Sequence, residues 1–250
     1  MAISALASFL RLGPQINFPS DVKTNVEMLL RWIHFLAGIT WIGLLYYFNF
    51  VQVPFFAETE PGVRSGAQQK LLPRALWWFR WGAMITFLSG WLYLLHYWLG
   101  MRGINDPGTW KILIGALLGS IMWANVWFVI WPKNKIVIQN ALDTAAGKPA
   151  NPAAAAAGAR GGLASRTNVA MSIPMLFFMG AASHFGSLSV GKSGVVFWVV
   201  AIAIMVLVEI NALVGTPGKG AAKPLATVKG TLWLGFVLTL IYYVWFWIMQ

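Results

Sequence analysis

The chain has no cysteine and few charged residues. Without cysteine, its 250 residues cannot form disulfides, thiolate metal sites or the C-x-x-C-H motif to which c-type haem is covalently attached. Charged residues make up 10% of the chain, against about 25% in soluble domains. Hydrophobic residues make up 58%. This balance indicates an integral membrane protein.

Several catalytic motifs are also missing from the sequence. It has no glycine-rich phosphate loop, no Ser-His-Asp grouping and no H-E-x-x-H helix, so hydrolase and nucleotide-binding functions have no support. The net charge is +11, but membrane proteins usually carry their Lys and Arg residues in cytoplasmic loops. No basic cluster interleaved with aromatic residues lies outside the apolar segments. We therefore expect no nucleic-acid partner.

Apolar segments of membrane-crossing length recur along the chain. Each is close to the roughly 20 residues that a transmembrane helix needs. None alternates apolar and polar residues as the strands of a β-barrel do. The segments are 28–50, 77–99, 112–131, 169–188, 195–214 and 232–249. The sequence therefore predicts an all-α integral membrane protein, a bundle of about six transmembrane helices.

The ends and the longest connection suggest a simple domain organisation. Residues 1–24 form an N-terminal segment that could include an interfacial helix, because its apolar residues Ile3, Leu6, Phe9 and Leu10 share one helical face. Residues 25–250 form a single transmembrane domain. Within it, 133–166 is rich in Ala, Gly and Pro and is typical of a linker.

Charge placement predicts the orientation in the membrane. With six spans, both termini lie on one side, together with six of the 18 Lys and Arg residues. The other twelve lie on the opposite side, which includes the 133–166 linker. Because basic residues favour the cytoplasmic side, we expect a cytoplasmic linker and both termini outside.

The histidines are the strongest candidate site residues. In the predicted topology, all three lie in the outer half of the membrane. His34 has Gly38 one helical turn away and Trp41 two turns away, which leaves space beside its imidazole for a planar cofactor such as haem. A hydrogen bond from His34 to a neighbouring helix is the alternative. His184 has Gly180 one turn before it and so has similar space.

The third histidine and one acidic residue are harder to interpret. His96 lies among Tyr and Trp residues typical of a membrane interface, where it needs no special role. We therefore expect His34 and His184, from two different helices, to ligate haem b, although another metal such as copper stays open. Glu209 is the one carboxylate deep in an apolar segment. It suits either a proton relay or an ion pair with a loop lysine.

Four stretches of the chain resemble the membrane domain of bacterial cytochrome-c-linked urate hydroxylases, the urate oxidase N-terminal family. The resemblance covers roughly residues 28–188, and the last third matches less well. His34 and His184 fall on histidines of the family motifs, whereas His96 does not. The stretches are Arg31–His34 with Gly38–Gly43, Trp78–Trp81 with Phe87–Gly90, Asn125–Pro132, and Pro174–Met179 with Ser183–Phe185.

The resemblance implies a bacterial inner-membrane location and electron exchange with an extracytoplasmic c-type cytochrome, because such a domain commonly follows the membrane domain in the family. No C-x-x-C-H motif follows the sixth segment here. We therefore expect a separate cytochrome c, or a larger membrane redox complex, as the partner. Three functions stay open: a haem b electron-transfer protein, an enzyme that oxidises urate or another small reductant, and a structural subunit.

Overall fold

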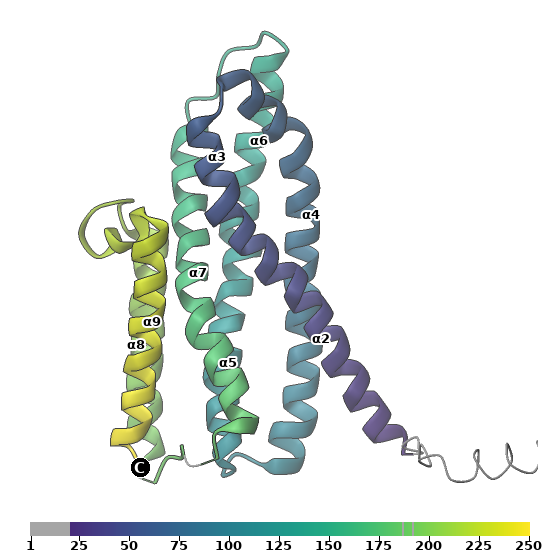
Figure 1. The fold of residues 1–250 in the computed structure, drawn as a ribbon, viewed down its shortest axis with the longest axis vertical. Helices are drawn as coiled ribbons and strands as arrows, with labels where there is room; N and C mark the ends of the chain where they lie inside the picture. The colour runs from purple at the N-terminus through teal and green to yellow at the C-terminus, as the bar shows by residue number, and fades with distance from the viewer. Residues whose placement is uncertain (1–20, 187, 192) are drawn as a thin grey trace, which may run out of the picture.

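Helices make up all the regular structure that the computed structural model describes. It describes residues 21–186, 188–191 and 193–250, and no strand occurs in these ranges (Figure 1). The predicted all-α fold is confirmed. Of the expected N-terminal segment, 1–20 lies outside the described residues. Val22 already belongs to the first described helix.

The first helical rod is built from α2 (Val22–Tyr46), the π-helical segment η1 (Tyr47–Gln52) and α3 (Val53–Glu58). Asp21 starts it, because its carboxylate accepts hydrogen bonds from the backbone N–H groups of Lys23 at 3.2 Å and Thr24 at 3.1 Å. Many apolar side chains of α2 are exposed, which suits a helix surrounded by lipid.

Two further rods follow. The second is α4 (Pro61–Tyr93) continued by η2 (Leu94–Arg102), and the third is α5 (Pro107–Ala124), η3 (Asn125–Ile130) and α6 (Trp131–Ala145). Like η1, η2 and η3 are π-helical, and such wide turns often occur at functional sites. Rods one and two cross closely at Gly82, where a Cβ atom would lie 3.3 Å from the carbonyl oxygen of Ala37.

Helix α7 (Ala154–His184) occupies the middle of the bundle (Figure 1). It packs against α5, α6 and α9, and about half of its residues are buried. Many of the buried positions are Ala, Gly, Ser or Thr, which let neighbouring backbones approach closely. Helix α7 is therefore the central helix, which α5, α6 and α9 contact.

Helices α8 (Gly194–Val214) and α9 (Val228–Ile248) form a pair on one flank of the bundle (Figure 1). The short 3₁₀ turns η4 (Gly220–Ala222) and η5 (Pro224–Ala226) lie in their connection. The pair is attached through α9, which packs on α7, and through Trp198 of α8, whose ring stacks on Trp110 of α5 at 5.5 Å. The outward faces of both helices are apolar and exposed.

The structure supports a multi-pass membrane protein but does not confirm the expected count of six spans. In the described part of the chain, four helical stretches are long and apolar enough to cross a membrane: 22–58, 107–145, 194–214 and 228–248. Helices α4 and α7 are long but more polar, because basic residues lie within each of them. The location in the inner membrane and the orientation of the termini stay predictions.

The stretch interpreted as a linker, 133–166, is largely helical. Its first part belongs to α6 and its last part to α7, so only 146–153 lies outside these helices. The alanine run from Ala153 to Ala157 helps to explain this difference, since alanine has the highest helix propensity. The start of α2 and the C-terminus lie at one end of the bundle, and the 146–153 loop lies at the other (Figure 1).

Candidate functional site

His34 is held between α2 and α4. Its Nδ1 atom lies 2.9 Å from the backbone carbonyl oxygen of Thr86 in α4. The ring occupies a notch left by Gly90, where a Cβ atom would lie 2.7 Å from the His34 Cε1 atom. The hydrogen bond to a neighbouring helix, which the sequence left as an alternative, is therefore present.

This contact fixes the tautomer of His34. A carbonyl oxygen can only accept, so Nδ1 must carry a hydrogen, and in the neutral ring the lone pair is therefore on Nε2. No hydrogen bond to Nε2 occurs within the described ranges. Metal-ligating histidines commonly have this arrangement, with one ring nitrogen donating to a carbonyl and the other facing the metal.

Thr86 of α4 lies beside Gly38. A Cβ atom at Gly38 would lie 3.8 Å from the Thr86 Cγ2 atom, which is ordinary van der Waals contact. Trp41 is 2% exposed, and its indole Nε1 has no hydrogen-bond partner in the described part of the chain. The roles of Gly38 and Trp41 beside a cofactor stay predictions.

His184 is the last residue of α7 and is exposed. Its Nδ1 atom lies 3.0 Å from the carbonyl oxygen of Gly180, one turn earlier in the same helix. No atom lies within 4 Å of the position that a Cβ of Gly180 would take, so the space expected there is open. By the same argument as for His34, the Nε2 atom of His184 keeps its lone pair.

The structure brings α2 and α7 into contact away from the two histidines. Tyr46 and Ser172 share a hydrogen bond of 2.8 Å between their hydroxyl groups, and the Asn49 amide donates to the Ser165 hydroxyl at 2.8 Å. Toward the end of the bundle where α7 ends, α2 diverges from α7 and stays in contact with α4 and η2 (Figure 1). Among the described residues, no hydrogen bond or ring contact joins His34 to His184.

His96 has a partner that the sequence analysis missed. Its Nε2 atom lies 3.3 Å from the Oε1 atom of Glu27, and the Glu27 residue is 9% exposed. Arg31 follows Glu27 by one helical turn, and the Cζ atom of its guanidinium lies 4.7 Å from the centre of the Tyr93 ring. Since Glu27 precedes the first apolar segment, only the packing of α2 against η2 could reveal the pairing.

Glu209 also has a partner, but it is not a loop lysine. Its Oε2 atom accepts a hydrogen bond of 2.9 Å from the amide of Asn125, which in turn bonds to Asn168. The sequence analysis did not single out either asparagine. Polar amides inside apolar segments are the signal that could have found them.

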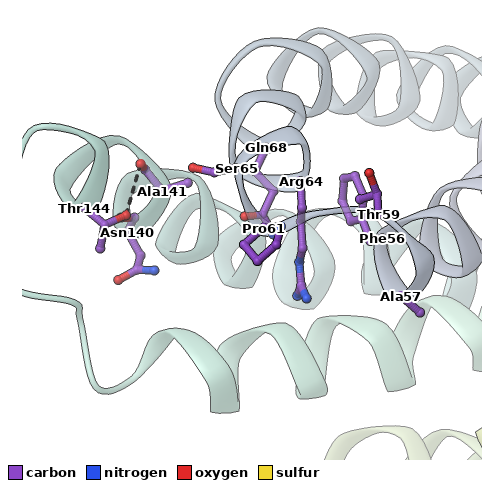
Figure 2. A pocket seen from close by; sticks show the side chains of 10 residues that line it. All are labelled: Phe56, Ala57, Thr59, Pro61, Arg64, Ser65, Gln68, Asn140, Ala141 and Thr144. Atoms are coloured by element: carbon purple, nitrogen blue, oxygen red, sulfur yellow. Dashed lines mark hydrogen bonds between the residues drawn. The ribbon is translucent and has the colours of Figure 1, made fainter.

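A polar cavity of about 350 Å³ lies at the other end of the bundle from the end of α7. Figure 2 shows that its lining comes from the α3–α4 turn and from α6. Arg64 is the one charged residue in the lining, and no histidine takes part. This cavity is therefore separate from the candidate histidines. Its lining residues are Phe56, Ala57, Thr59, Pro61, Arg64, Ser65, Gln68, Asn140, Ala141 and Thr144.

The described residues contain no group of three or more His, Cys, Asp or Glu side chains that could hold a metal ion. Haem iron needs only two imidazoles as axial ligands, so the ligand assignment for His34 and His184 stays a prediction.

Comparisons with known proteins identify the family. A search of curated proteins and a search of solved structures both found no match. The family model described as urate oxidase N-terminal matches residues 92–242. The match includes the last third of the chain, which the motifs suggested would match less well, and it begins after His34. Because the matched range is more than half of the 250 residues, the chain belongs to the urate oxidase N-terminal family.

Proposed function

We propose that this protein is a membrane-integral redox subunit that holds haem b through His34 and His184. It would exchange electrons with an extracytoplasmic cytochrome c or within a larger membrane redox complex. Family membership supports a urate-related membrane protein. The observation that carries the finer proposal is the bond between His34 Nδ1 and the Thr86 carbonyl, which leaves Nε2 as a lone-pair donor.

The chemistry of the donors fits this cofactor. Both imidazoles have Nδ1 against a backbone carbonyl, so each can offer a neutral Nε2 to iron. Since Thr86 and Gly90 close the α2–α4 interface, the cofactor would lie on the side of His34 that faces away from α4.

The residues have separate roles in this proposal. Haem b, when bound, supplies a one-electron couple whose potential depends on its axial ligands and on the polarity around it. The Thr86 carbonyl orients the His34 ring and fixes its protonated nitrogen. The Gly180 carbonyl does the same for His184.

The test is the absorption spectrum of the purified protein from cells supplied with haem. We expect a Soret band in the wild type and its loss in His34→Ala and His184→Ala. The matched control is His96→Ala, which removes the histidine that already pairs with Glu27 and should keep the band. A missing Soret band, or one that survives the double change of His34 and His184, would contradict the proposal.

A second candidate function is an enzyme that oxidises urate or a related small reductant, with cytochrome c as acceptor. The name of the matched family is the observation that favours it. Urate-dependent reduction of added cytochrome c by membranes containing the protein would support it. If no purine reduces the acceptor while the Soret band is present, the electron-carrier proposal is favoured. Co-purification with other membrane proteins and no bound cofactor would favour a structural subunit.

A further inference from the structure

Helix α8 carries one carboxylate among apolar residues. Glu209 lies five residues before the end of the helix at Val214 and is half-buried. Its Oε2 atom is 2.9 Å from the Nδ2 atom of Asn125, and Oε1 has no hydrogen-bond partner in the described part of the chain. A carboxylate held by one neutral donor inside a membrane helix is unusual and calls for a functional explanation.

The hydrogen bonds around Glu209 have a fixed direction. The Met122 carbonyl can only accept, so the Asn168 group that contacts it at 2.9 Å must be the Nδ2 amide. The Oδ1 atom of Asn168 therefore faces Asn125 as an acceptor at 2.9 Å. Asn125 must then present its own Nδ2 group, and the second hydrogen of that group points to Glu209.

Both asparagines are deeply buried. Asn125 is 2% exposed and Asn168 is fully buried, so neither can exchange its partners for water easily. Asn125 is the first residue of η3, which places it at the change from α-helical to π-helical turns. The network thus joins three helical elements, α5–η3, α7 and α8, and ends at the carboxyl group.

Among the residues that the structure describes, no Lys, Arg or His side chain lies within ion-pair distance of Glu209. Arg160 of α7 contacts α8 three residues after Glu209, where it donates to the Ala212 carbonyl at 2.9 Å. The titratable residues on elements packed against α8 are Arg160, Arg166 and His184 of α7, Lys111 of α5, Lys219 and Lys223 around η4, and Lys229, Tyr242 and Tyr243 of α9.

We infer that Glu209, held by Asn125 and Asn168, is an intramembrane proton-binding site that exchanges H⁺ with the end of the bundle where α8 ends. The proton comes from hydronium, binds to the free Oε1 atom and leaves by the same route, so no other reactant is needed. The five residues to the helix end correspond to about 7.5 Å, at 1.5 Å of rise per residue. A proton therefore reaches Glu209 over a shorter distance from the Val214 end of α8 than from the Gly194 end.

The direction of the network favours a proton over a metal cation. A sodium or calcium ion needs several oxygen ligands that converge on it. Here Glu209 Oε2 and Asn168 Oδ1 each accept a hydrogen bond from Asn125, so both oxygens point toward the N–H groups of this amide and do not converge on a shared cation position. The free Oε1 atom alone can take a proton but cannot form a metal shell.

The test is infrared difference spectroscopy of the full chain in lipid nanodiscs during a pH titration. We expect a carboxylic-acid C=O band that shifts in D₂O and is lost in Glu209→Gln. Glutamine has the same size and can still accept from Asn125, so this variant should fold. Glu27→Gln, which changes the buried carboxylate beside His96, is the control and should keep the band.

A second variant tests the role of the asparagine. Asn125→Leu removes the donor that stabilises the ionised carboxylate, so the midpoint of the band should rise by about one pH unit or more. Asn125→Ser gives a shift of the same sign if the leucine variant does not fold. A band that persists in Glu209→Gln overturns the inference, as does a midpoint that Asn125 variants do not move or that depends on sodium. The result is independent of whether haem is bound.

Discussion

The imidazole of His34 lies where a side chain at Gly90 would have to be. A Cβ atom at position 90 would be 2.7 Å from the His34 Cε1 atom and 2.9 Å from Nδ1. The absence of a side chain there allows the ring to reach the Thr86 carbonyl, one turn earlier in α4. Gly90, the last residue of the Phe87–Gly90 motif, therefore allows the hydrogen bond between His34 and Thr86.

Gly90→Ala should displace the His34 ring and break its bond to Thr86. We expect a loss of about 1–3 kcal/mol in stability, typical of overpacking, together with a weaker or shifted Soret band if His34 ligates haem. Thermal unfolding in detergent and the absorption spectrum measure the two effects. Gly43→Ala is the control, since no atom lies within 4 Å of a Cβ there. Equal behaviour of the two variants would contradict this account.

Asn49 and Ser165 should be energetically coupled. The Asn49 amide donates to the Ser165 hydroxyl at 2.8 Å, and the two residues are 3% and 9% exposed. A double-mutant cycle with alanine should give a coupling of about 0.5–2 kcal/mol, the range for hydrogen bonds between membrane helices. Unfolding in denaturing detergent provides the measurement. Thr40→Ala in place of Asn49→Ala is the comparison, because Thr40 bonds only within α2, and its coupling to Ser165 should be near zero.

Lys111 should hold the end of α7 in place. Its ammonium group is buried and donates to the carbonyl oxygens of Phe185 at 2.5 Å and Leu188 at 2.8 Å. Lys111→Met keeps the length of the side chain but leaves both carbonyls without a donor. We expect a loss of about 2–3 kcal/mol and faster hydrogen exchange in peptides containing Phe185 and Leu188. Unchanged exchange in these peptides would show that the bonds do not order the segment.

The start of α2 should loosen in acid. The hydroxyl of Thr24, and then the backbone N–H groups of Thr24 and Lys23, lower the pKa of Asp21 below its ordinary value of 3.8. A carboxylate with a lowered pKa stabilises the folded state fully above its ordinary value, and this contribution is lost as the pH falls through the lowered value. The protection of the Val26 amide against hydrogen exchange, relative to its intrinsic rate at each pH, should therefore decrease below about pH 3.8.

Asp21→Asn provides the control for this pH effect. Asparagine can still cap the helix, but it does not titrate in this range. In this variant, the protection of Val26 relative to its intrinsic exchange rate should stay constant across the acid range. An acid-induced decrease in protection that persists in the variant would assign the effect to another group.

The sequence predicted the fold class well because the signal is local. Each apolar segment can be recognised alone, and α8 and α9 agree with the predicted segments to within a few residues. Within 133–166, the sequence predicts only a short helix at Ile136–Leu142, because glycine and proline near Lys148 obscure the strong helix propensity of the neighbouring alanines. The number of spans is harder to predict, because α4 and α7 are long but carry basic residues.

The candidate site was predictable only in part. The chain itself shows a histidine next to small residues, and Trp41 is indeed buried on the same helix as His34. The partners of the three polar residues come from other helices: Thr86 for His34, Glu27 for His96 and Asn125 for Glu209. These pairings span 52, 69 and 84 residues, respectively, and no local pattern specifies them.

The wide turn of η3 changes how the third rod should be compared with its relatives. One additional residue in a helix advances every later side chain by about 100° around the axis. Removing a single residue from η3 would therefore turn α6 so that Ala141, now buried, faces a different direction. Relatives that differ by one residue at this position should be aligned with a gap there, or their inward-facing residues will be assigned to the wrong side.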